Sequence, residues 1–353
     1  MIEIKHIGES DKSLWDNFVG NSSEASPYHR YAWGQAVQSS YGFTPIYLGA
    51  FNNNELVGIL PLVKMGLPLR KAYYVSLPYC DCSGIIANNN DAYEALHDYA
   101  IKVLSKSEHT SLTLRAGTYA TTDAEKIKQN TKVRMILPLE ASVDEQMAAF
   151  KSKLRSQIRK AEKNGLRACV SEFSDSDAFK QQFNAFYHVM ACNMHSLGSP
   201  VHSRAWFYEV LKHYGKHAYL ALVYKEEVAV GGAIVLMNGK NASIPWASTL
   251  ADYNRLAPNM LLYWQVLSEA VEQKMLSFDF GRSTMGEGTY RFKKQWGCEP
   301  ALLSWQEFNE GEPVDNNDMQ KSKARSIIEQ TWQKLPLGLT TFVGPKVRKF
   351  ISL

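Results

Sequence analysis

The feature that most constrains the fold is one order of elements that occurs twice along the chain. Residues 46–64 form a strand, an Asn-rich turn and a second strand, which is the pattern of a β-hairpin. Residues 218–237 repeat this pattern around a short charged turn. An extended stretch, a helical pattern and a further strand follow each hairpin, in residues 73–87, 91–105 and 111–116 and in residues 242–249, 259–275 and 277–283. The repeat predicts an α/β (α+β) fold built from two tandem copies of one domain.

The length of the chain agrees with two domains. Its 353 residues exceed the size at which a single hydrophobic core usually stops growing, and domains of about 150 residues are the common unit. The acidic, Asn-rich residues 311–318 resemble a linker, and a further helix is expected from about 319 to 334. We predict a first domain at 1–145, a basic connecting helix at 146–165, a second domain at 166–310 and a C-terminal helical tail at 311–353.

Composition excludes several classes of protein. The net charge of +4 is too small for bulk coating of nucleic acid. The five cysteines show no CxxC pairs, and their odd number argues against a closed disulfide framework. No run approaches the roughly 18 to 20 apolar residues of a membrane span. No Ser-His-Asp order, His-rich cluster or nucleotide-binding Gly-rich loop stands out, so neither a metal nor a nicotinamide cofactor is expected. We expect a cytoplasmic protein with reduced thiols.

Two basic segments each allow two interpretations. In residues 144–166, Lys151, Arg155 and Arg159 share one face of a helical pattern, and Arg155 and Arg159 stand one turn apart. Their guanidinium groups could converge on a phosphate, or the face could simply be solvated. The last residues, 335–353, mix Leu and Phe with Lys and Arg. This segment could touch a membrane surface or dock on the protein.

The repeated unit resembles the acyltransferase fold of the GNAT superfamily, in which a late helix often carries a Tyr and an ending such as Lys-x-Gly-Phe. Residues 289–300, TYRFKKQWGCEP, fit that layout with Trp-Gly in place of Gly-Phe. The duplication and the basic connection resemble the Fem aminoacyltransferases of peptidoglycan cross-bridge synthesis. The nearest resemblance is to the FemAB-related subgroup associated with exopolysaccharide and exosortase (PEP-CTERM) systems. It is carried by residues 28–37, 56–63, 76–87, 153–166 and 278–300.

The chain departs from that family in two places that concern the donor. The long coiled-coil arm of many Fem transferases, thought to help hold tRNA, has no counterpart in residues 180–300. The Gly-containing loop that binds the pyrophosphate of acetyl-CoA in GNAT enzymes is also absent, because residues 253–260 read YNRLAPNM. No bound cofactor is expected. The acyl donor is a co-substrate, either aminoacyl-tRNA or acyl-CoA.

The resemblance implies a transfer site in the late motif. Its Phe-Lys pair maps onto Phe292 and Lys293, and a Lys there could stabilise an oxyanion or pair with a substrate carboxylate or phosphate. Tyr290 could donate a proton to the leaving group or be a buried structural residue. Asp279 is a third candidate catalytic residue and Arg282 is a candidate substrate-binding residue. Both lie at the end of a buried strand, where an internal ion pair and a substrate clamp both fit.

A turn should bring this motif into place. Gly286 and Gly288 are expected to turn the chain off the strand, because Gly adopts positive φ without strain. Phe292 should then pack inward, and Lys293 should point into a cleft between sheet and helix.

Other candidate substrate-binding residues lie earlier in each copy. The resemblance places His29, Arg30 and Trp33 where Fem proteins face a nucleotide- or lipid-linked sugar acceptor, and Asp81 lies in a turn whose freed N–H groups could meet a ligand. In the second copy, residues expected to border the same cleft are Trp246, Asn259 and Tyr263. Each of these residues also has an ordinary structural interpretation.

Together these features predict an acyl- or aminoacyltransferase that acts on an amine or hydroxyl of a cell-envelope precursor, either peptidoglycan or exopolysaccharide. The expected partners are a lipid- or nucleotide-linked sugar, tRNA, and the inner membrane as a peripheral contact. Two alternatives remain. One is an acyl-CoA-dependent N-acyltransferase of a small molecule or sugar, and the other is a non-catalytic GNAT-derived binding module in polysaccharide assembly.

Overall fold

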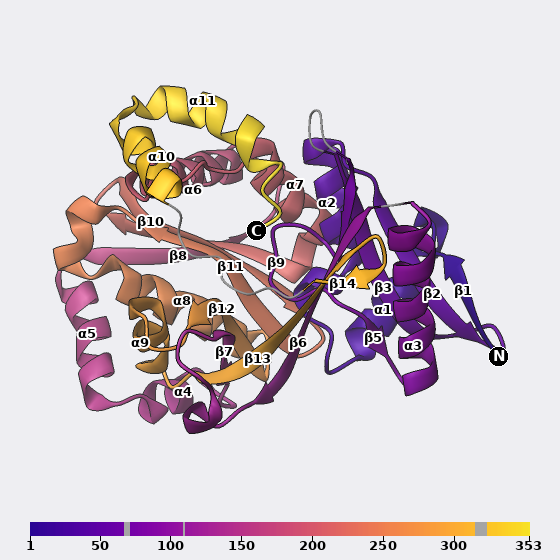
Figure 1. Cartoon of the computed structure of the whole chain (residues 1–353). Coiled ribbons are helices and arrows are strands. Elements are labelled where there is room, and N and C mark those ends of the chain that lie inside the picture. The colour runs from indigo at the N-terminus through magenta and orange to yellow at the C-terminus, as the bar shows by residue number, and fades with distance from the viewer. Residues whose placement is uncertain (67–70, 109, 315–322) are drawn as a thin grey trace.

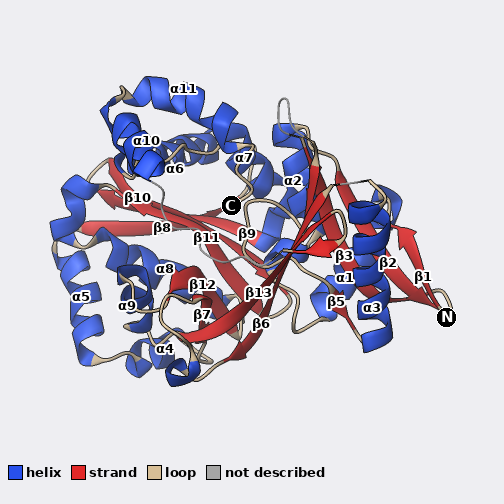
Figure 2. Ribbon diagram, viewed as in Figure 1, coloured by secondary structure: helices blue, strands red, loops and turns tan. Residues whose placement is uncertain are grey.

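The computed structural model describes residues 1–66, 71–108, 110–314 and 323–353. The predicted linker and the first residues of the predicted helix at 319–334 therefore lie partly outside the described residues. Helices cover both faces of one large mixed sheet, as Figures 1 and 2 show. Within the described ranges, no helix is both long and apolar enough to cross a lipid bilayer.

The first half supplies seven strands: β1 (Ile2–His6), β2 (Pro45–Asn52), β3 (Glu55–Met65), β4 (Tyr73–Val75), β5 (Ile86–Ala87), β6 (Ser111–Thr121) and β7 (Lys132–Pro138). Its helices are α1 (Lys12–Asn21), α2 (Tyr31–Tyr41) and α3 (Asn90–Asp98), the last continued by a π-helical segment at Tyr99–Lys106. Short 3-10 turns lie at Glu9–Asp11, Pro27–His29 and Ala124–Lys126. The predicted first hairpin is confirmed, because β2 and β3 pair antiparallel.

The second half supplies the remaining strands: β8 (Leu166–Glu172), β9 (Ala218–Lys225), β10 (Val228–Asn238), β11 (Asn241–Thr249), β12 (Ser277–Thr284), β13 (Glu299–Asn309) and β14 (Glu312–Pro313). Its helices are α4 (Val143–Ala149), α5 (Ser152–Lys163), α6 (Asp177–Ser196), α7 (Arg204–Tyr214), α8 (Pro258–Glu272), α9 (Gly288–Lys294), α10 (Lys323–Lys334) and α11 (Leu337–Arg348). Short 3-10 turns lie at Gly215–His217 and Ala251–Leu256. The second hairpin is also confirmed, by the antiparallel pairing of β9 and β10.

The strand order shows the duplication and an exchange within it. The sheet runs β1-β2-β3-β4-β6-β13-β7-β12-β11-β10-β9-β8, so five strands of each half flank a central pair. In that central pair each half contributes a strand that lies next to the other half: β13 lies beside β6, and β7 lies beside β12. The fold is thus two copies of one α/β unit that share a continuous sheet. The predicted boundaries stay a prediction, and strand pairing crosses them.

Among the described residues, each half contains one parallel strand pair, joined by a helical crossover as parallel pairing requires. In the first half, β4 pairs with β6 after the α3 segment, and in the second half β11 pairs with β12 after α8. Both pairings are short. In the second half they cover only residues 241–243 and 277–279. Beyond these residues the two strands separate.

An aromatic core joins the two halves next to this separation. Trp33 of α2 is fully buried, and its ring stacks on Trp246 of β11 with centroids 5.8 Å apart. Trp206 of α7 meets both rings edge to face. Edge-to-face and stacked aromatic pairs add to the burial of apolar area. The halves are therefore held together by packing as well as by the sheet.

The C-terminal helices α10 and α11 lie against α6, at the top of the view in Figure 1. Gly344 of α11 comes so close to the backbone of Val201 that a Cβ would lie 3.2 Å from its nitrogen. After α11 the chain returns toward the centre of the molecule, where the Tyr79 N–H donates to the carbonyl oxygen of Ser352 at 2.6 Å. The tail is thus docked on the protein at both ends.

Candidate functional site

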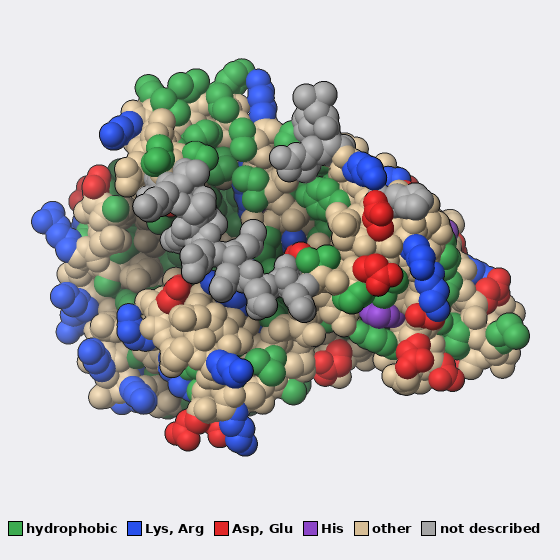
Figure 3. Space-filling view, viewed as in Figure 1, with side chains coloured by type: hydrophobic (Ala, Val, Ile, Leu, Met, Phe, Trp, Pro, Cys, Tyr) green, Lys and Arg blue, Asp and Glu red, His purple; other side chains and the backbone are tan. Residues whose placement is uncertain are grey.

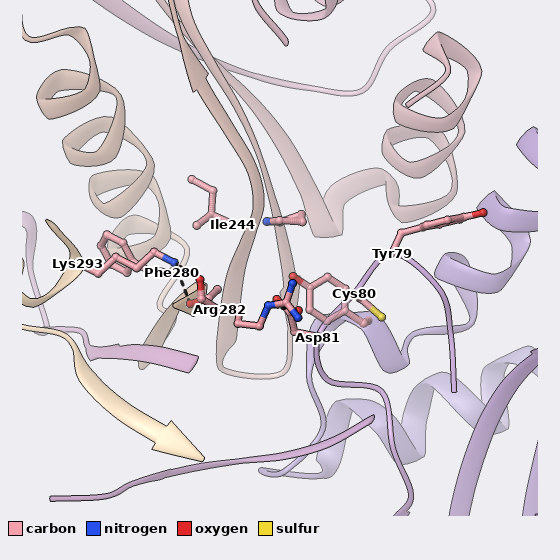
Figure 4. Close-up of a pocket in the computed structure, with 10 residues that line it drawn as sticks. Tyr79, Cys80, Asp81, Ile244, Phe280, Arg282 and Lys293 are labelled. Carbon is pink, nitrogen blue, oxygen red and sulfur yellow. Dashed lines mark hydrogen bonds and ion pairs between the residues drawn. The ribbon is translucent and has the colours of Figure 1, made fainter. Parts of the chain in front are cut away.

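A pocket of about 230 Å³ opens where β11 and β12 separate (Figure 4). Ile244 and Pro245 of β11 and Phe280 and Gly281 of β12 line it, directly after the last paired residues of each strand. Pro245 has no N–H to donate to a neighbouring strand, which favours the end of pairing at this point. The pocket therefore follows from the local sequence of both strands.

A β-bulge shapes the β12 side of the pocket. The register between β12 and β7 shifts between Asp279 and Arg282, and Gly281 adopts a φ of +76° within this bulge. The Gly281 N–H donates to Oδ1 of Asp279 at 2.8 Å. Because a bulge removes residues from the strand ladder, the carbonyl oxygens of Gly281 and Arg282 are free for another donor.

Lys293 of α9 is that donor. Its ammonium donates to the carbonyl oxygens of Gly281 at 2.9 Å and Arg282 at 3.0 Å, as the dashed line in Figure 4 indicates. The side chain is buried and lines the pocket. Burial lowers the pKa of Lys293 to about 8, and the nearby Asp279 carboxylate opposes this shift. An ammonium has three N–H groups, so one remains for a ligand in the pocket.

The opposite wall comes from the first half. Tyr28, Tyr79, Cys80 and Asp81 line it, and Asp81 Oδ1 lies 3.4 Å from Nε of Arg282 across the pocket. Burial raises the pKa of the Cys80 thiol to about 12, so this thiol stays protonated near neutral pH. Cys80 is therefore a poor nucleophile, because the thiolate is the reactive form.

A buried ion pair supports the bulge from behind. Arg134 of β7 donates from Nε and Nη2 to Oδ2 of Asp279, at 3.0 and 2.9 Å. Its guanidinium also lies over the ring of Tyr119, 4.1 Å from the centroid. Of the two interpretations given for Asp279, the structure shows the internal ion pair, with Arg134 as its partner.

The corresponding place in the first half is filled. After Val75 pairs with Thr113, β4 and β6 separate, and the buried guanidinium of Arg115 occupies the space. It donates to the carbonyl oxygens of Cys80 at 3.1 Å and of Ser352 in the tail at 2.8 Å. The two halves thus differ at equivalent positions, and the pocket opens at the strand separation of the second half.

Of the residues singled out from the sequence, the pocket brings together Asp81, Arg282 and Lys293. Phe292 and Tyr290 lie beside it on α9 and pack against the core of the second half. The Phe292 ring meets Tyr263 edge to face at 5.2 Å, and Tyr263 in turn stacks on the pocket residue Phe280.

The candidate acceptor residues of the first half lie outside the pocket lining. His29 is fully buried, where its Nδ1 accepts from the Ser26 N–H at 3.0 Å and its Nε2 lies 3.0 Å from the Gly84 carbonyl. Burial lowers the pKa of His29 to about 4. Arg30 lies 3.6 Å from Asp16. The Trp33 indole donates to a backbone carbonyl.

The remaining candidates are also apart from the pocket lining. Trp246 belongs to the aromatic core, and Asn259 lies in the first turn of α8. Arg155 of α5 donates to the carbonyl oxygens of Ala148 and Phe150 at the end of α4, whereas Arg159 is exposed on α5. The phosphate-binding role of these two arginines stays a prediction.

Of the two glycines that were expected to turn the chain before α9, one does so. Gly286 has a φ of +82° and makes the turn, but Gly288 has no positive φ and begins the helix. The bulge glycine, Gly281, has the second positive φ of this segment.

Sequence reasoning did not select most of the pocket lining: Tyr28, Tyr79, Cys80, Ile244, Pro245, Phe280 and Gly281. Several of them are neighbours of selected residues, such as Phe280 and Gly281 between Asp279 and Arg282. The break of the strand pattern at Pro245 was a usable signal. Within the described residues, no group of three or more His, Cys, Asp or Glu side chains is arranged to hold a metal ion.

Comparisons with known proteins agree with this geometry. Residues 148–294 match the family model described as an acetyltransferase (GNAT) domain. This range contains β11, α8, β12 and α9, and therefore the second-half side of the pocket. A search of curated proteins finds no significant match.

Solved structures match the whole architecture. The crystal structure of FemX has a TM-score of 0.66 at 15% identity, covering 94% of this chain and 100% of FemX. The C-terminal domain (DUF2156) of a putative lysylphosphatidylglycerol synthetase from Agrobacterium fabrum has a TM-score of 0.55 at 12% identity, with 83% and 91% covered. A tandem GNAT protein from the clavulanic acid biosynthesis pathway has a TM-score of 0.53 at 12% identity, with 89% and 100% covered.

The fold is therefore that of the tandem GNAT proteins. Within it, residues 148–294, from the end of α4 to the end of α9, are similar in sequence to the acetyltransferase (GNAT) domain family. Membership of the exopolysaccharide-associated FemAB-related subgroup stays a prediction.

Proposed function

We propose that this protein transfers an acyl or aminoacyl group to an amine or hydroxyl of a cell-envelope precursor. The observation that carries the proposal is the buried Lys293 ammonium, which lies in a pocket lined by both halves. The GNAT match places that lysine in an acetyltransferase-type domain, and the FemX-like fold agrees with a cell-wall role. The proposed location is the cytoplasm, with peripheral contact to the inner membrane.

The chemistry would be direct attack. The acceptor nitrogen or oxygen forms a bond to the donor carbonyl carbon and loses a proton. The bond from that carbon to the ester oxygen of tRNA or the thioester sulfur of CoA breaks, and the leaving oxygen or sulfur takes up a proton. The free N–H of Lys293 would donate to the oxyanion that forms in between. The protonated Cys80 thiol does not offer a covalent route. Positioning and charge stabilisation thus account for the catalysis.

The other pocket wall would orient the acceptor. The Asp81 carboxylate and the Arg282 guanidinium lie 3.4 Å apart and remain partly exposed. Arg282 also lies over the Trp305 ring, 5.1 Å from its centroid, which limits its motion. A carboxylate accepts hydrogen bonds from an attacking amine, and a guanidinium binds carboxylate or phosphate groups of a substrate.

A second candidate is an acyl-CoA-dependent N-acyltransferase of a small molecule or sugar. The match of residues 148–294 to an acetyltransferase domain favours this alternative. The two candidates share the pocket and Lys293 but differ in the donor. Because a bound donor stabilises the folded state, its identity can be read from thermal unfolding.

The test combines binding with transfer. Purified protein would be incubated with acyl-CoAs or aminoacyl-tRNAs and with lipid- or nucleotide-linked sugar acceptors, and acceptor mass would be followed by mass spectrometry. We expect a donor that raises the melting temperature also to support an acyl mass gain. A rise with acyl-CoA alone would select the second candidate. Binding of an envelope glycan without turnover with any donor would indicate a binding module instead.

A further inference from the structure

The helices α10 and α11 present a surface that the transfer chemistry does not use. On α11, Thr340 and Gly344 face inward and are buried against the protein. Leu339 and Phe342 face outward, with 45% and 66% of their surface exposed. Figure 3 shows hydrophobic side chains gathered over these two helices at the top of the molecule. We call Leu339, Phe342 and Lys346 the α11 face, because their spacing places them on one side of the helix.

Basic charge accompanies the apolar side chains. Residues 334–353 contain four Lys or Arg residues and no Asp or Glu. The ammonium of Lys346 lies 3.9 Å from the centroid of the Phe342 ring, so an aromatic ring and a cation share the exposed face. Exposed Phe and Leu next to Lys and Arg are the pattern of helices that lie in a lipid interface.

The helix α10 also carries exposed apolar side chains. Ile327 and Ile328 of α10 are 63% and 64% exposed. Large exposed apolar side chains gathered on one helical hairpin mark an interaction surface. Binding of a protein partner would require the exposed apolar side chains but not the basic ones. The exposed cations of this segment, Lys334 and Lys346, complement anionic lipid headgroups, which favours a lipid surface over a protein partner.

We propose that α10 and α11 dock on an anionic lipid bilayer through the α11 face. The end of this segment also reaches the pocket. The Tyr79 hydroxyl donates to the Lys349 carbonyl at 2.5 Å, and the Tyr79 N–H donates to the Ser352 carbonyl, while Tyr79 itself lines the pocket. The segment that is proposed to dock therefore also contacts one wall of the pocket. The purpose of this docking rests on the proposed function. Vesicle binding is measured without any transfer reaction, so a failure of membrane docking and a failure of the transfer function can be told apart.

The test is cosedimentation of the full chain with vesicles of phosphatidylcholine alone or mixed with phosphatidylglycerol. We expect binding to the anionic vesicles that weakens as salt is raised, because lipid charge is screened. The double variant Leu339→Ser/Phe342→Ser should bind at least about tenfold more weakly, since apolar burial drives interfacial binding. Leu276→Ser is the matched control, because Leu276 is 63% exposed on another part of the surface. It should bind like the unaltered protein.

Charge is tested separately. Lys346→Glu should weaken binding to anionic vesicles, whereas Lys126→Glu, at an exposed position near Asp123, should not. Circular dichroism checks that each variant is folded. The proposal is overturned if the unaltered protein does not sediment with anionic vesicles, or if the face variants and controls bind equally. It is also overturned if the face variants abolish self-association of the chain instead of vesicle binding.

Discussion

The guanidinium of Arg134 lies 2.9 Å from the carboxylate of Asp279, and both side chains are almost fully buried. Arg134 belongs to β7 and Asp279 to β12, so this ion pair joins strands of the two halves. The second oxygen of Asp279 accepts from the Gly281 N–H, in the bulge whose carbonyl oxygens bind Lys293. The relative position of the two halves is thus coupled to the geometry of the pocket.

Breaking this pair should cost much of the stability of the fold. Asp279→Leu leaves the Arg134 charge buried without a partner, and such a loss typically costs about 3–5 kcal/mol. The double variant Arg134→Met/Asp279→Leu should regain most of the lost free energy of unfolding, because it removes both buried charges. Urea unfolding of the single and double variants measures both effects. A single variant as stable as the unaltered protein would show that the pair does not hold the halves together.

The pocket lysine should be needed for transfer. Lys293→Met removes the donor proposed for the oxyanion, and loss of one such donor costs about 2.7–4 kcal/mol of barrier, or roughly a hundredfold or more in turnover. The matched control is Lys294→Met, since Lys294 is the next residue but pairs with Glu299 at the surface. Turnover of the control should stay near that of the unaltered protein. Full activity of Lys293→Met in a working assay would refute the assigned role.

The depressed pKa of Lys293 predicts how activity depends on pH. If the ammonium is the active form, kcat/KM should fall as the pH rises through about 8, where the free protein loses this proton. If Lys293 acted instead as a base in its neutral form, kcat/KM should rise as the pH rises through the same value. The pH profile of kcat/KM distinguishes the two directions.

Lys293 should also make the stability of the protein depend on pH within a limited pH range. Folding lowers the pKa of Lys293 from 10.5 to about 8. Below about pH 8 the buried side chain is charged, so the free-energy cost of burying that charge is fully present. Between those values the unfolded chain binds more protons than the folded one, and stability from this group rises with pH. Lys293→Met should remove this rise from the pH dependence of urea unfolding. An unchanged slope would contradict the burial of the ammonium.

Two nearby glycines should respond differently to alanine. Gly286 has a φ of +82°, and an added Cβ would lie 2.4 Å from the Gln129 side-chain oxygen. Gly286→Ala should therefore lower stability by about 1–2 kcal/mol, the cost of a left-handed conformation. Gly288 meets nothing within 4 Å of an added Cβ and starts a helix. Thermal unfolding of Gly288→Ala should show no loss, and equal losses in both variants would contradict the assigned backbone roles.

The sequence predicted the repeated elements well because their signals are local. Hairpins such as 46–64 and the helix at 259–275 follow from alternation and helical periodicity within one segment. The exchange of β7 and β13 could not be predicted in this way, because a strand pattern does not state its partner. Lys293 was found from its motif, whereas Tyr79 and Cys80 were missed because they reach the pocket from the other half.

Local pattern also explains the ambiguous residues. Asp279 and Arg282 are polar residues at the end of a buried strand, and the sequence alone offered an ion pair or a clamp for both. The structure separates them, because Asp279 pairs with Arg134 whereas Arg282 faces Asp81 at the pocket. The side toward which each side chain points depends on the bulge at Gly281, which alters the alternation of the strand.

The exchange of β7 and β13 has a consequence for synthesis on the ribosome. The edge of β6 cannot receive its neighbour until residues 299–309 have been made, and β7 must wait for β12. At about 5–20 residues per second, the delay after β6 is roughly 10 to 40 seconds. During that time the nascent N-terminal half carries open strand edges, which favour pairing with other chains. Holding chaperones should therefore engage this half before the C-terminal half emerges, and a premature stop between β7 and β12 should yield an aggregating fragment instead of a folded domain.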